Sequence, residues 1–252
     1  MKVLIGDIGN TLIKLSVVNN NYKIIKSYSF ETKKIHNQLF LKNLFKKILK
    51  NKLRKNILFS SVVPKAYKKI RTHLIKHNYK VHEIKDLKIS RIIKLKVDNY
   101  KQLGSDRIAN AIGAFYNYKT NCLVIDFGTA TTFDIVKKPG IYEGGVIAPG
   151  VKLSIYNLNL NTASLPIFKL RKTSKIYGKN TKDALNAGFL WGYQGLIDNI
   201  TQKITKKLQN NFKIILTGGY ANIFLRFLTK KASIDNNITV KGIIYIYKKL
   251  IK

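Results

Sequence analysis

Residues 3–18 read VLIGDIGNTLIKLSVV, which is an apolar strand, a turn that carries Asp7 and Gly9, and a second apolar strand. The pattern returns at residues 122–137, where CLVIDFGTATTFDIVK places Asp126 and Gly128 at the turn. In such a hairpin the glycine lets backbone N–H groups approach phosphate oxygens, whereas a carboxylate approaches phosphate only through a cation. Two copies therefore predict two related halves that face one nucleotide.

The hairpin context separates these turns from two other phosphate motifs. The P-loop and the dinucleotide fingerprint lead from a strand through glycines directly into a helix. Here each turn leads into another strand, at residues 12–18 and 131–137. The sequence therefore favours a phosphate site of the strand-turn-strand kind.

Hydrophobic periodicity predicts a similar order of elements after both hairpins. The first half has predicted strands at 22–30, 57–63 and 79–84 and helices at 37–50, 65–77 and 107–118. The second half has predicted strands at 141–147 and 212–216, helices at 151–160, 183–207 and 221–229, and a last strand and helix within 238–252.

This order predicts an α/β fold class with two actin-like (ribonuclease H-like) domains and a nucleotide cleft between them. The expected boundaries are 1–118 for the N-terminal domain and 119–252 for the C-terminal domain. Actin, heat-shock ATPases and sugar kinases share this architecture. It predicts nucleotide-driven chemistry and leaves the substrate open.

The chain is strongly basic, with 47 Lys and Arg against 12 Asp and Glu and a formal net charge of +35. Such an excess ordinarily indicates nucleic acid or a membrane surface as a partner. The basic residues are mostly lysines, spread along the whole chain among abundant Ile, Asn and Tyr, which indicates a compositional drift rather than a binding patch. We expect weak, salt-sensitive binding to polyanions and no specific nucleic acid.

Cysteine content and hydropathy indicate a cytoplasmic location. Cys122 is the single cysteine, so no disulfide framework is expected within the chain. We find no apolar run of about 18 residues and no leader pattern, so neither a membrane partner nor a signal peptide is expected.

Eight short blocks, taken in order, carry a resemblance to a known family. They are Asp7-Ile8-Gly9-Asn10-Thr11-Leu12-Ile13-Lys14, Ser61-Val62-Val63-Pro64, Gly104-Ser105-Asp106-Arg107, Asp126-Phe127-Gly128-Thr129-Ala130-Thr131-Thr132-Phe133-Asp134, Gly144-Gly145-Val146-Ile147-Ala148-Pro149-Gly150, Leu165-Pro166, Gly178-Lys179-Asn180-Thr181 and Thr217-Gly218-Gly219. Each block is weak by itself, but in this order they resemble the type III pantothenate kinases over nearly the whole chain.

The resemblance implies ATP-dependent phosphorylation of the primary hydroxyl of pantothenate to 4'-phosphopantothenate, the first step of coenzyme A biosynthesis. It implies ATP and pantothenate as partners, a homodimer, and Mg²⁺ together with a monovalent cation, K⁺ or NH4⁺, as cofactors.

The first turn is predicted to cradle ATP. Asp7 would hold Mg²⁺, directly or through water, and the alternative is an Asx turn that satisfies the hairpin backbone. The other expected members of the cradle are Ile8, Gly9, Asn10, Thr11, Leu12, Ile13 and Lys14. Lys14 is equally explained as a solvated strand residue in a lysine-rich chain.

Asp106 is the predicted general base. In phosphoryl transfer the enzyme mainly positions the reactants, while one carboxylate accepts the proton of the attacking alcohol. Spacing alone favours a helix N-cap for Asp106, worth about 1 kcal/mol. The resemblance assigns it the catalytic role instead. The helix N-terminus is expected to lower its pKa.

The resemblance also implies a set of substrate contacts around this base. They are Tyr100, Gly104, Ser105, Asp106, Arg107 and Thr181. The planar fork of Arg107 suits the carboxylate of pantothenate, and a surface ion pair is the alternative. Tyr100 is equally explained by core packing and Thr181 by helix capping.

In the second turn, the resemblance assigns Asp126 to the monovalent cation and Thr129 to the phosphates of ATP. The sequence alone does not distinguish K⁺ from Mg²⁺ at Asp126. For Thr129 the alternative is an ordinary β-branched strand residue.

Two other functions stay open at the level of sequence. A sugar kinase of the same superfamily would read its substrate with several Asn, Asp, Glu and His contacts, which the segment around Asp106 does not display. A nucleic-acid-binding or transcription accessory protein on the same scaffold would bind DNA selectively at physiological salt and release no ADP with pantothenate.

Overall fold

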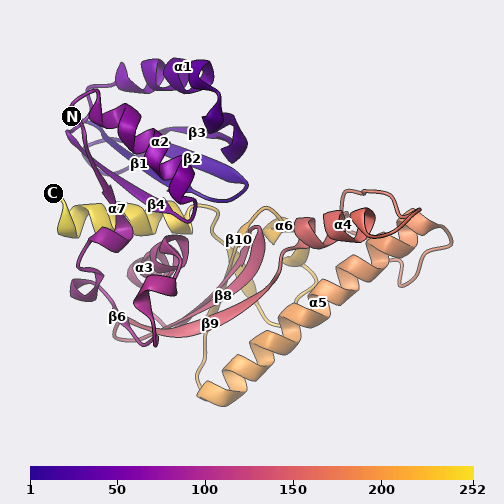
Figure 1. Ribbon diagram of the computed structural model, residues 1–252. Helices are drawn as coiled ribbons and strands as arrows, with labels where there is room; N and C mark the ends of the chain where they lie inside the picture. Colours follow the sequence, from indigo (N-terminus) through magenta and orange to yellow (C-terminus); the bar gives the residue numbers. More distant parts are fainter. The chain divides into compact units, whose positions relative to one another are not determined.

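The computed structural model describes all 252 residues, and the chain divides into two compact units (Figure 1). Unit 1 consists of Met1–Lys119, Pro139–Tyr142 and Asn237–Lys252. Unit 2 consists of Thr120–Lys138 and Glu143–Asn236.

Unit 1 is built on a five-stranded sheet with the order β3-β2-β1-β4-β5. Its strands are β1 (Val3–Ile8), β2 (Leu12–Val18), β3 (Ile24–Glu31), β4 (Asn56–Ser61) and β5 (Lys80–Glu83). The first three strands pair antiparallel as successive hairpins, whereas β4 pairs parallel with β1 and β5 pairs parallel with β4. The central strand β1 is apolar on both faces because both faces of the sheet are covered.

Helices cover both faces of this sheet (Figure 1). They are α1 (Gln38–Leu49), α2 (Pro64–Ile75), α3 (Ser105–Tyr118) and α7 (Ile238–Leu250), with short 3-10 turns η1 (Thr32–His36), η2 (Ile84–Asp86), η3 (Ile89–Arg91) and η4 (Tyr100–Gln102). Helices α1 and α2 bury their apolar stripes in one core cluster with β1, β2 and β4. Helices α3 and α7 pack on each other, and α7 also packs on β1 and β4.

The contact between α3 and α7 depends on two glycines. A Cβ at Gly242 would overlap the carbonyl oxygen of Ala109, and a Cβ at Gly113 would overlap that of Ile238. The two backbones therefore approach more closely than any larger residue would allow. The hydroxyl of Thr239 on α7 donates to Asn110 Oδ1 on α3 at 2.7 Å. This packing places the C-terminal helix in unit 1.

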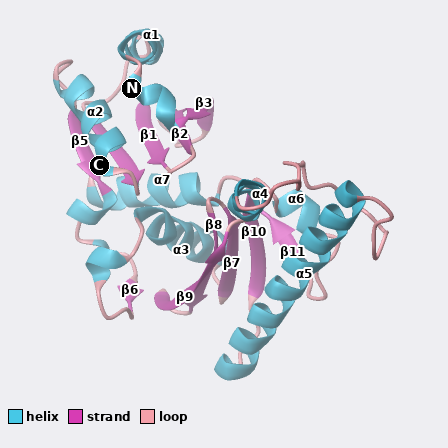
Figure 2. Ribbon diagram, turned by 45° about the vertical axis from the view of Figure 1, so that its right-hand side comes forward, coloured by secondary structure: helices cyan, strands magenta, loops and turns pink.

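Unit 2 contains a sheet with the order β11-β10-β7-β8-β9 (Figure 2). Its strands are β7 (Cys122–Phe127), β8 (Ala130–Lys137), β9 (Ile141–Pro149), β10 (Lys213–Gly218) and β11 (Ala232–Ile234). Strand β7 pairs antiparallel with β8 and parallel with β10. The first residues of β9, Ile141 and Tyr142, are counted with unit 1, where they pair with β6 (Lys94–Leu95).

The helices of unit 2 are α4 (Val151–Leu160), α5 (Thr181–Leu208) and α6 (Ala221–Phe224). They pack into one core cluster with β7 and β10, to which α5 contributes Leu190, Ile197 and Ile204. Although α5 runs for 28 residues, neither it nor any other helix combines the length and the apolar composition that crossing a membrane requires.

Most predicted elements are confirmed, and the C-terminal tail is the main correction. The strand predicted within 238–252 is wrong, since α7 is continuous from Ile238 to Leu250 and the last strand is β11, further upstream. The run of Ile and Tyr favours a strand locally, but burial of Ile238, Ile243 and Ile246 in a helical spacing prevails. The predicted helix 221–229 is also too long, because α6 ends at Phe224.

The division into residues 1–118 and 119–252 stays a proposal about the two related halves. The compact units differ from it because Lys119, Pro139–Tyr142 and Asn237–Lys252 cluster with unit 1.

Replacing Gly242 by Ala tests the contact between α3 and α7. We expect Gly242→Ala to lower the free energy of unfolding by about 1–3 kcal/mol, because the new methyl group overpacks the interface. Gly195→Ala on α5 is the matched control, since nothing lies within 4 Å of a Cβ there. The control is expected to stabilise its helix by up to about 1 kcal/mol. Thermal unfolding followed by circular dichroism measures both, and equal melting temperatures would contradict the assignment.

Candidate active site

The first turn is a tight hairpin end between β1 and β2. The N–H of Gly9 donates to the carbonyl oxygen of Leu12 at 3.0 Å, and a Cβ at Gly9 would lie 3.1 Å from that oxygen. The hydroxyl of Thr32 donates to the Gly9 carbonyl at 2.7 Å and fixes the turn from the side of η1. Asn10 and Thr11 lie exposed at its tip.

The Asp7 carboxylate lies one residue before the end of β1, between two neighbouring strands. In the sheet register Asp7 faces Lys14 on β2 and Ser60 on β4. The Ser60 hydroxyl donates to Asp7 Oδ1 at 3.0 Å, so this contact orients the carboxylate from β4. This contact, rather than the Asx turn considered as the alternative, accounts for the orientation of the carboxylate.

The other residues predicted to bind ATP at the first turn differ in how far their side chains are exposed to solvent. The side chains of Ile8 and Ile13 are fully buried in the core. Only their backbones are left for contact with a nucleotide. Leu12 is 43% exposed, and Lys14 is exposed as well.

The protein has no cluster of three or more His, Cys, Asp and Glu side chains able to hold a metal ion. A cation at Asp7 would therefore take one carboxylate from this unit's turn and its remaining ligands from phosphate and water. Mg²⁺ is bound in this way at many phosphate-transferring sites. A single carboxylate at Asp7, completed by phosphate and water oxygens, is therefore a set of ligands that suits Mg²⁺.

Asp106 lies in the first turn of α3. Gly104 is the N-cap of that helix and Asp106 the second helical residue, so the alternative explanation of Asp106 as the N-cap is wrong. Asp106 Oδ1 accepts from the N–H of Arg107 at 2.8 Å. Burial raises the pKa of the Asp106 carboxyl above its usual range, although the Arg107 N–H, the Arg107 guanidinium and the Lys85 ammonium act in the opposite direction.

The expected lowering of the Asp106 pKa by the helix terminus is therefore wrong. The sequence shows that the residue lies at the start of a helix, but it does not show that its carboxyl is partly withdrawn from water. Desolvation penalises the charged form, and here it outweighs the backbone N–H donors and the neighbouring cations. A carboxylate with a raised pKa is a stronger proton acceptor.

Gly104 leaves room for the Asp106 carboxylate. A Cβ at Gly104 would overlap Asp106 Oδ1 and would lie 3.5 Å from Val62 Cγ1. A carboxylate on a flexible side chain can move out of the way, so a larger residue here would displace the charge and leave the backbone in place.

Tyr100 and Arg107 lie in the same unit as Asp106. Tyr100 begins η4, and its buried hydroxyl has no hydrogen-bond partner within the protein. Burial raises the pKa of Tyr100, and the negative charges of Glu83 and Asp86 raise it further. The hydroxyl therefore stays protonated and can donate a hydrogen bond. Arg107 is half-buried in the first turn of α3.

Glu83 is a residue that the sequence analysis missed. It is buried at the end of β5, and its carboxylate accepts a hydrogen bond from the Ser105 hydroxyl, directly before Asp106. Its one sequence signal is rarity, since the chain has only 12 acidic residues. Nothing in the local pattern indicates that the end of a short strand reaches the start of α3.

In unit 2 the second turn repeats the hairpin of the first. The N–H of Gly128 donates to the Ala130 carbonyl at 3.1 Å. Asp126 precedes the turn on β7, beside β10, where a Cβ at Gly218 would lie 2.7 Å from Asp126 Oδ1. Gly218 has φ +85°, a conformation that favours glycine. Thr129 is exposed at the turn, and its carbonyl oxygen lies against Gly150, the N-cap of α4.

Thr181 begins α5 in unit 2 but does not cap it. The N-cap is Asn180, whose side chain accepts from the N–H of Asp183 at 2.9 Å. The capping explanation for Thr181 is therefore wrong, and its hydroxyl lies in an exposed first turn. Its place beside the substrate residues of unit 1 stays a prediction.

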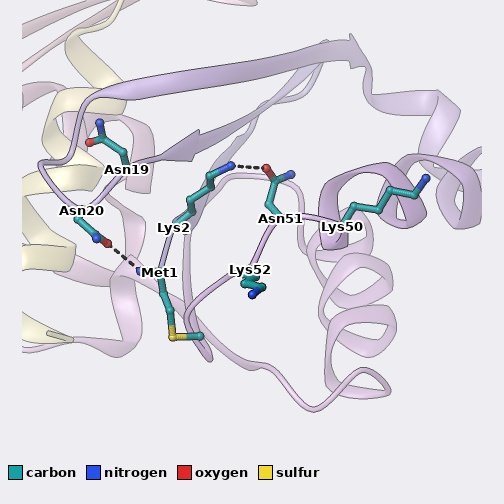
Figure 3. Close-up of a pocket in the computed structure, with 7 residues that line it drawn as sticks. All are labelled: Met1, Lys2, Asn19, Asn20, Lys50, Asn51 and Lys52. Carbon is teal, nitrogen blue, oxygen red and sulfur yellow. Dashed lines mark hydrogen bonds between the residues drawn. The ribbon is translucent and has the colours of Figure 1, made fainter.

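Two surface hollows of unit 1 contain none of the predicted site residues. One, of about 500 Å³, is lined by the N-terminus and by loop residues (Figure 3). Figure 3 shows the N-terminal amine donating to Asn20 Oδ1 and the Lys2 ammonium donating to Asn51 Oδ1, each at 3.0 Å. The other, of about 1420 Å³, lies between α1 and α2, and its lining includes six lysines together with His36, His73 and His77.

Comparison with known proteins gives one family over most of the chain. The family model described as type III pantothenate kinase matches residues 3–203. The type III pantothenate kinase of Pelagibacter ubique (strain HTCC1062) is 46% identical over 243 residues, which cover 96% of this chain and 97% of that protein. The type III pantothenate kinase of Desulforapulum autotrophicum is 33% identical over 249 residues, covering 96% and 94%.

Solved structures extend the likeness at the level of the fold. A Campylobacter jejuni protein provisionally assigned to the Baf family of transcriptional activators has a TM-score of 0.59 at 20% identity, covering 98% of each chain. The activator of 2-hydroxyisocaproyl-CoA dehydratase from Clostridium difficile, solved with bound ADPNP, has a TM-score of 0.55 at 12% identity, covering 99% of this chain and 95% of that one. The predicted actin-like fold is confirmed.

Replacing Gly104 by Ala tests whether this glycine sets the place of the Asp106 carboxylate. We expect Gly104→Ala to fold normally and to lower the pKa of the Asp106 carboxyl toward its ordinary value, because the displaced group meets more water. Carbon-detected NMR titration measures that pKa, with Asp106→Asn used to assign the resonance. Gly188→Ala, where nothing lies within 4 Å of a Cβ, is the control. An unchanged Asp106 titration in Gly104→Ala would refute the steric argument.

Proposed function

The chain belongs to the type III pantothenate kinase family, and we propose that it transfers the γ-phosphoryl group of ATP to the primary hydroxyl of pantothenate, giving 4'-phosphopantothenate and ADP. The observation that carries the proposal is the match to a named relative over 96% of the chain. The reaction is the first step of coenzyme A biosynthesis.

The first turn is the proposed seat of the ATP phosphates. The closed hairpin at Gly9 presents backbone N–H groups, and Asn10, Thr11 and Lys14 add exposed polar side chains. Asp7 would hold Mg²⁺, whose charge neutralises phosphate oxygens when it is bound. The contact from the Ser60 hydroxyl keeps the Asp7 carboxylate oriented.

Asp106 is the proposed general base. The hydroxyl oxygen of pantothenate forms a bond to the γ-phosphorus, the bond from that phosphorus to the β,γ-bridging oxygen breaks, and the hydroxyl proton passes to the Asp106 carboxylate. The raised pKa of Asp106 suits it to accept that proton, and the Arg107 N–H fixes one of its oxygens. The Asp106 side chain is thus both held in place by the protein and able to accept the proton.

The remaining substrate roles are proposed on chemical fit. The guanidinium of Arg107 offers two parallel donors to the pantothenate carboxylate. The buried Tyr100 hydroxyl is a donor that lacks a protein acceptor. Gly104 and Ser105 directly precede Asp106, and we propose that pantothenate passes along their backbone to reach it. Thr181 would add a hydroxyl from the start of α5.

Asp126 and Thr129 are proposed to serve a monovalent cation, K⁺ or NH4⁺, and the phosphates of ATP. The close approach of Gly218 to Asp126 Oδ1 supports a fixed carboxylate at this turn. A homodimer and a cytoplasmic location complete the proposal. The homodimer is carried over from the family, and the cytoplasmic location is supported by the single buried thiol of Cys122, which is compatible with a reducing compartment.

The alternatives named from the sequence are not favoured. The relatives covering nearly the whole chain are named as pantothenate kinases rather than as sugar kinases or transcription factors. The likeness to the Campylobacter jejuni protein, at 20% identity, concerns the fold alone.

An ADP-release assay with pantothenate tests the proposed function directly. We expect turnover with ATP, Mg²⁺ and K⁺, and a lower rate when Na⁺ replaces K⁺.

Asp106→Asn should lower kcat by about 10²–10⁴-fold, because the amide cannot accept the proton. Circular dichroism should show an unchanged fold. Near-normal turnover in Asp106→Asn would remove the base assignment, and absence of turnover in the parent protein would remove the function.

The pH profile tests the protonation state of Asp106. The base must be ionised to accept a proton, so kcat/KM should fall as the pH drops through its pKa. Because burial raises that pKa above the unperturbed value of 3.8, the acid limb should lie at higher pH than for an ordinary aspartate. Initial rates measured in constant-ionic-strength buffers check this. An acid limb at or below the ordinary value would contradict the burial argument.

A further inference from the structure

We propose that Glu83 is a positioning residue, whose buried carboxylate ties the start of α3 to the end of β4 and thereby fixes Asp106 relative to Asp7. The inference rests on the proposed function, because it concerns the placing of the proposed base. All the residues involved belong to unit 1.

Glu83 receives three donors from three separate segments. Its Oε1 accepts from the Ser105 hydroxyl at 2.5 Å and from the N–H of Ser61 at 3.2 Å. Its Oε2 accepts from the N–H of Lys85 at 2.6 Å. The carboxylate, which is only 9% exposed, thus joins the end of β4, the start of η2 and the start of α3.

The β4 side of this contact leads to the phosphate turn. Ser60 and Ser61 are consecutive in β4, and Ser61 pairs with Ile8 of β1. The Ser60 hydroxyl donates to Asp7 at 3.0 Å, while the N–H of Ser61 donates to Glu83. The two serines therefore link the proposed Mg²⁺ ligand on one side to the Glu83 carboxylate on the other.

The α3 side of this contact leads to the proposed base. Ser105 is fully buried as the first residue of α3, and Asp106 follows it directly. Its hydroxyl lies within hydrogen-bond distance of Glu83 Oε1 and, at 3.2 Å, of the Ser61 carbonyl oxygen. The hydroxyl has one proton, which the shorter contact assigns to Glu83, and this hydrogen bond holds the first turn of α3 against the ends of β4 and β5.

The hydrogen-bond partners of Glu83, rather than its pKa, indicate a positioning role. Burial raises the pKa of Glu83, as does the nearby Asp86, whereas the donors from Ser105, Lys85 and Ser61 lower it. All three of those donors point at the carboxylate oxygens, which as acceptors suit the ionised form. Both oxygens of the Glu83 carboxylate therefore already accept hydrogen bonds from the protein itself.

The Glu83→Gln and Ser105→Ala variants test this arrangement, with their double variant. Glutamine puts an amide donor where one carboxylate oxygen accepts a hydrogen bond, and it removes the negative charge that strengthens the contact with the Ser105 hydroxyl. We expect kcat to fall about 10- to 100-fold in each single variant, with the KM for ATP unchanged, because the base is displaced while the phosphate seat is not. The double variant should be no slower than the slower single one.

Glu31→Gln is the matched control. Glu31 has a side chain that is 50% exposed and pairs with Lys33 at 3.2 Å. We expect this variant to keep the parent kcat. An unchanged kcat in Glu83→Gln or Ser105→Ala would overturn the proposal. Losses that follow a lowered melting temperature in both would also overturn it, since they would indicate a merely structural role.

A second readout separates this inference from the proposed function. The NMR titration of Asp106 needs no substrate, and Ser105→Ala alters no charge, so a changed Asp106 pKa in that variant reports a displaced carboxyl. We expect the pKa to fall toward its ordinary value in Ser105→Ala and to stay unchanged in Glu31→Gln. An unchanged titration in Ser105→Ala would overturn the inference even if the parent protein phosphorylates pantothenate. Failure of the parent to turn over pantothenate would overturn the function alone.

Discussion

The parallel pairing of β1 with β4 is the constraint on which the site in unit 1 depends. An antiparallel hairpin alone would leave Asp7 with a neighbour on one side only. Because β4 runs parallel on the other side, its C-terminal end arrives beside the C-terminal end of β1, with Ser60 opposite Asp7. The strand ends of β4 and β5 in turn receive the start of α3 through Ser61 and Glu83. The groups proposed for phosphate binding and for proton transfer therefore lie at the C-terminal ends of β1, β4 and β5.

Unit 2 repeats this strand pairing, but with different residues around its carboxylate. Strand β7 has an antiparallel neighbour in β8 and a parallel one in β10, as β1 has in β2 and β4. Asp126 stands opposite Thr217, in the position that Asp7 takes opposite Ser60. The next residue of the parallel strand is Gly218, whose positive φ brings the backbone close to the Asp126 carboxylate. The same topology therefore presents two carboxylates in different surroundings, which suits the different cations proposed for them.

The sequence predicted the elements well where a local pattern and a buried face agree. The two hairpins are examples, since Asp7 and Asp126 each precede a glycine turn between strands. Tertiary effects account for the misses. The strand predicted in the tail is a helix because α7 packs on α3 through Gly242, a contact between residues far apart in the chain.

The same reason explains what was missed in the site. Burial of Asp106 reversed the expected direction of its pKa shift. The contact from Glu83 to Ser105 joins residues that are 22 positions apart and is absent from any local pattern. A sequence motif identifies which residue carries a charge, whereas its solvation depends on elements that meet only in the folded chain.

The distribution of acidic residues completes this argument. With 47 basic residues against 12 acidic ones, random placement would leave most carboxylates on the surface beside lysines. Instead Glu83, Asp134 and Asp235 are buried, and Asp7, Asp106 and Asp126 lie half-buried at strand ends or at a helix start. An exposed carboxylate contributes little to stability, whereas a buried one is costly unless it is hydrogen-bonded. The lysine excess therefore belongs to the surface composition, whereas these six carboxylates are partly or fully withdrawn from that surface.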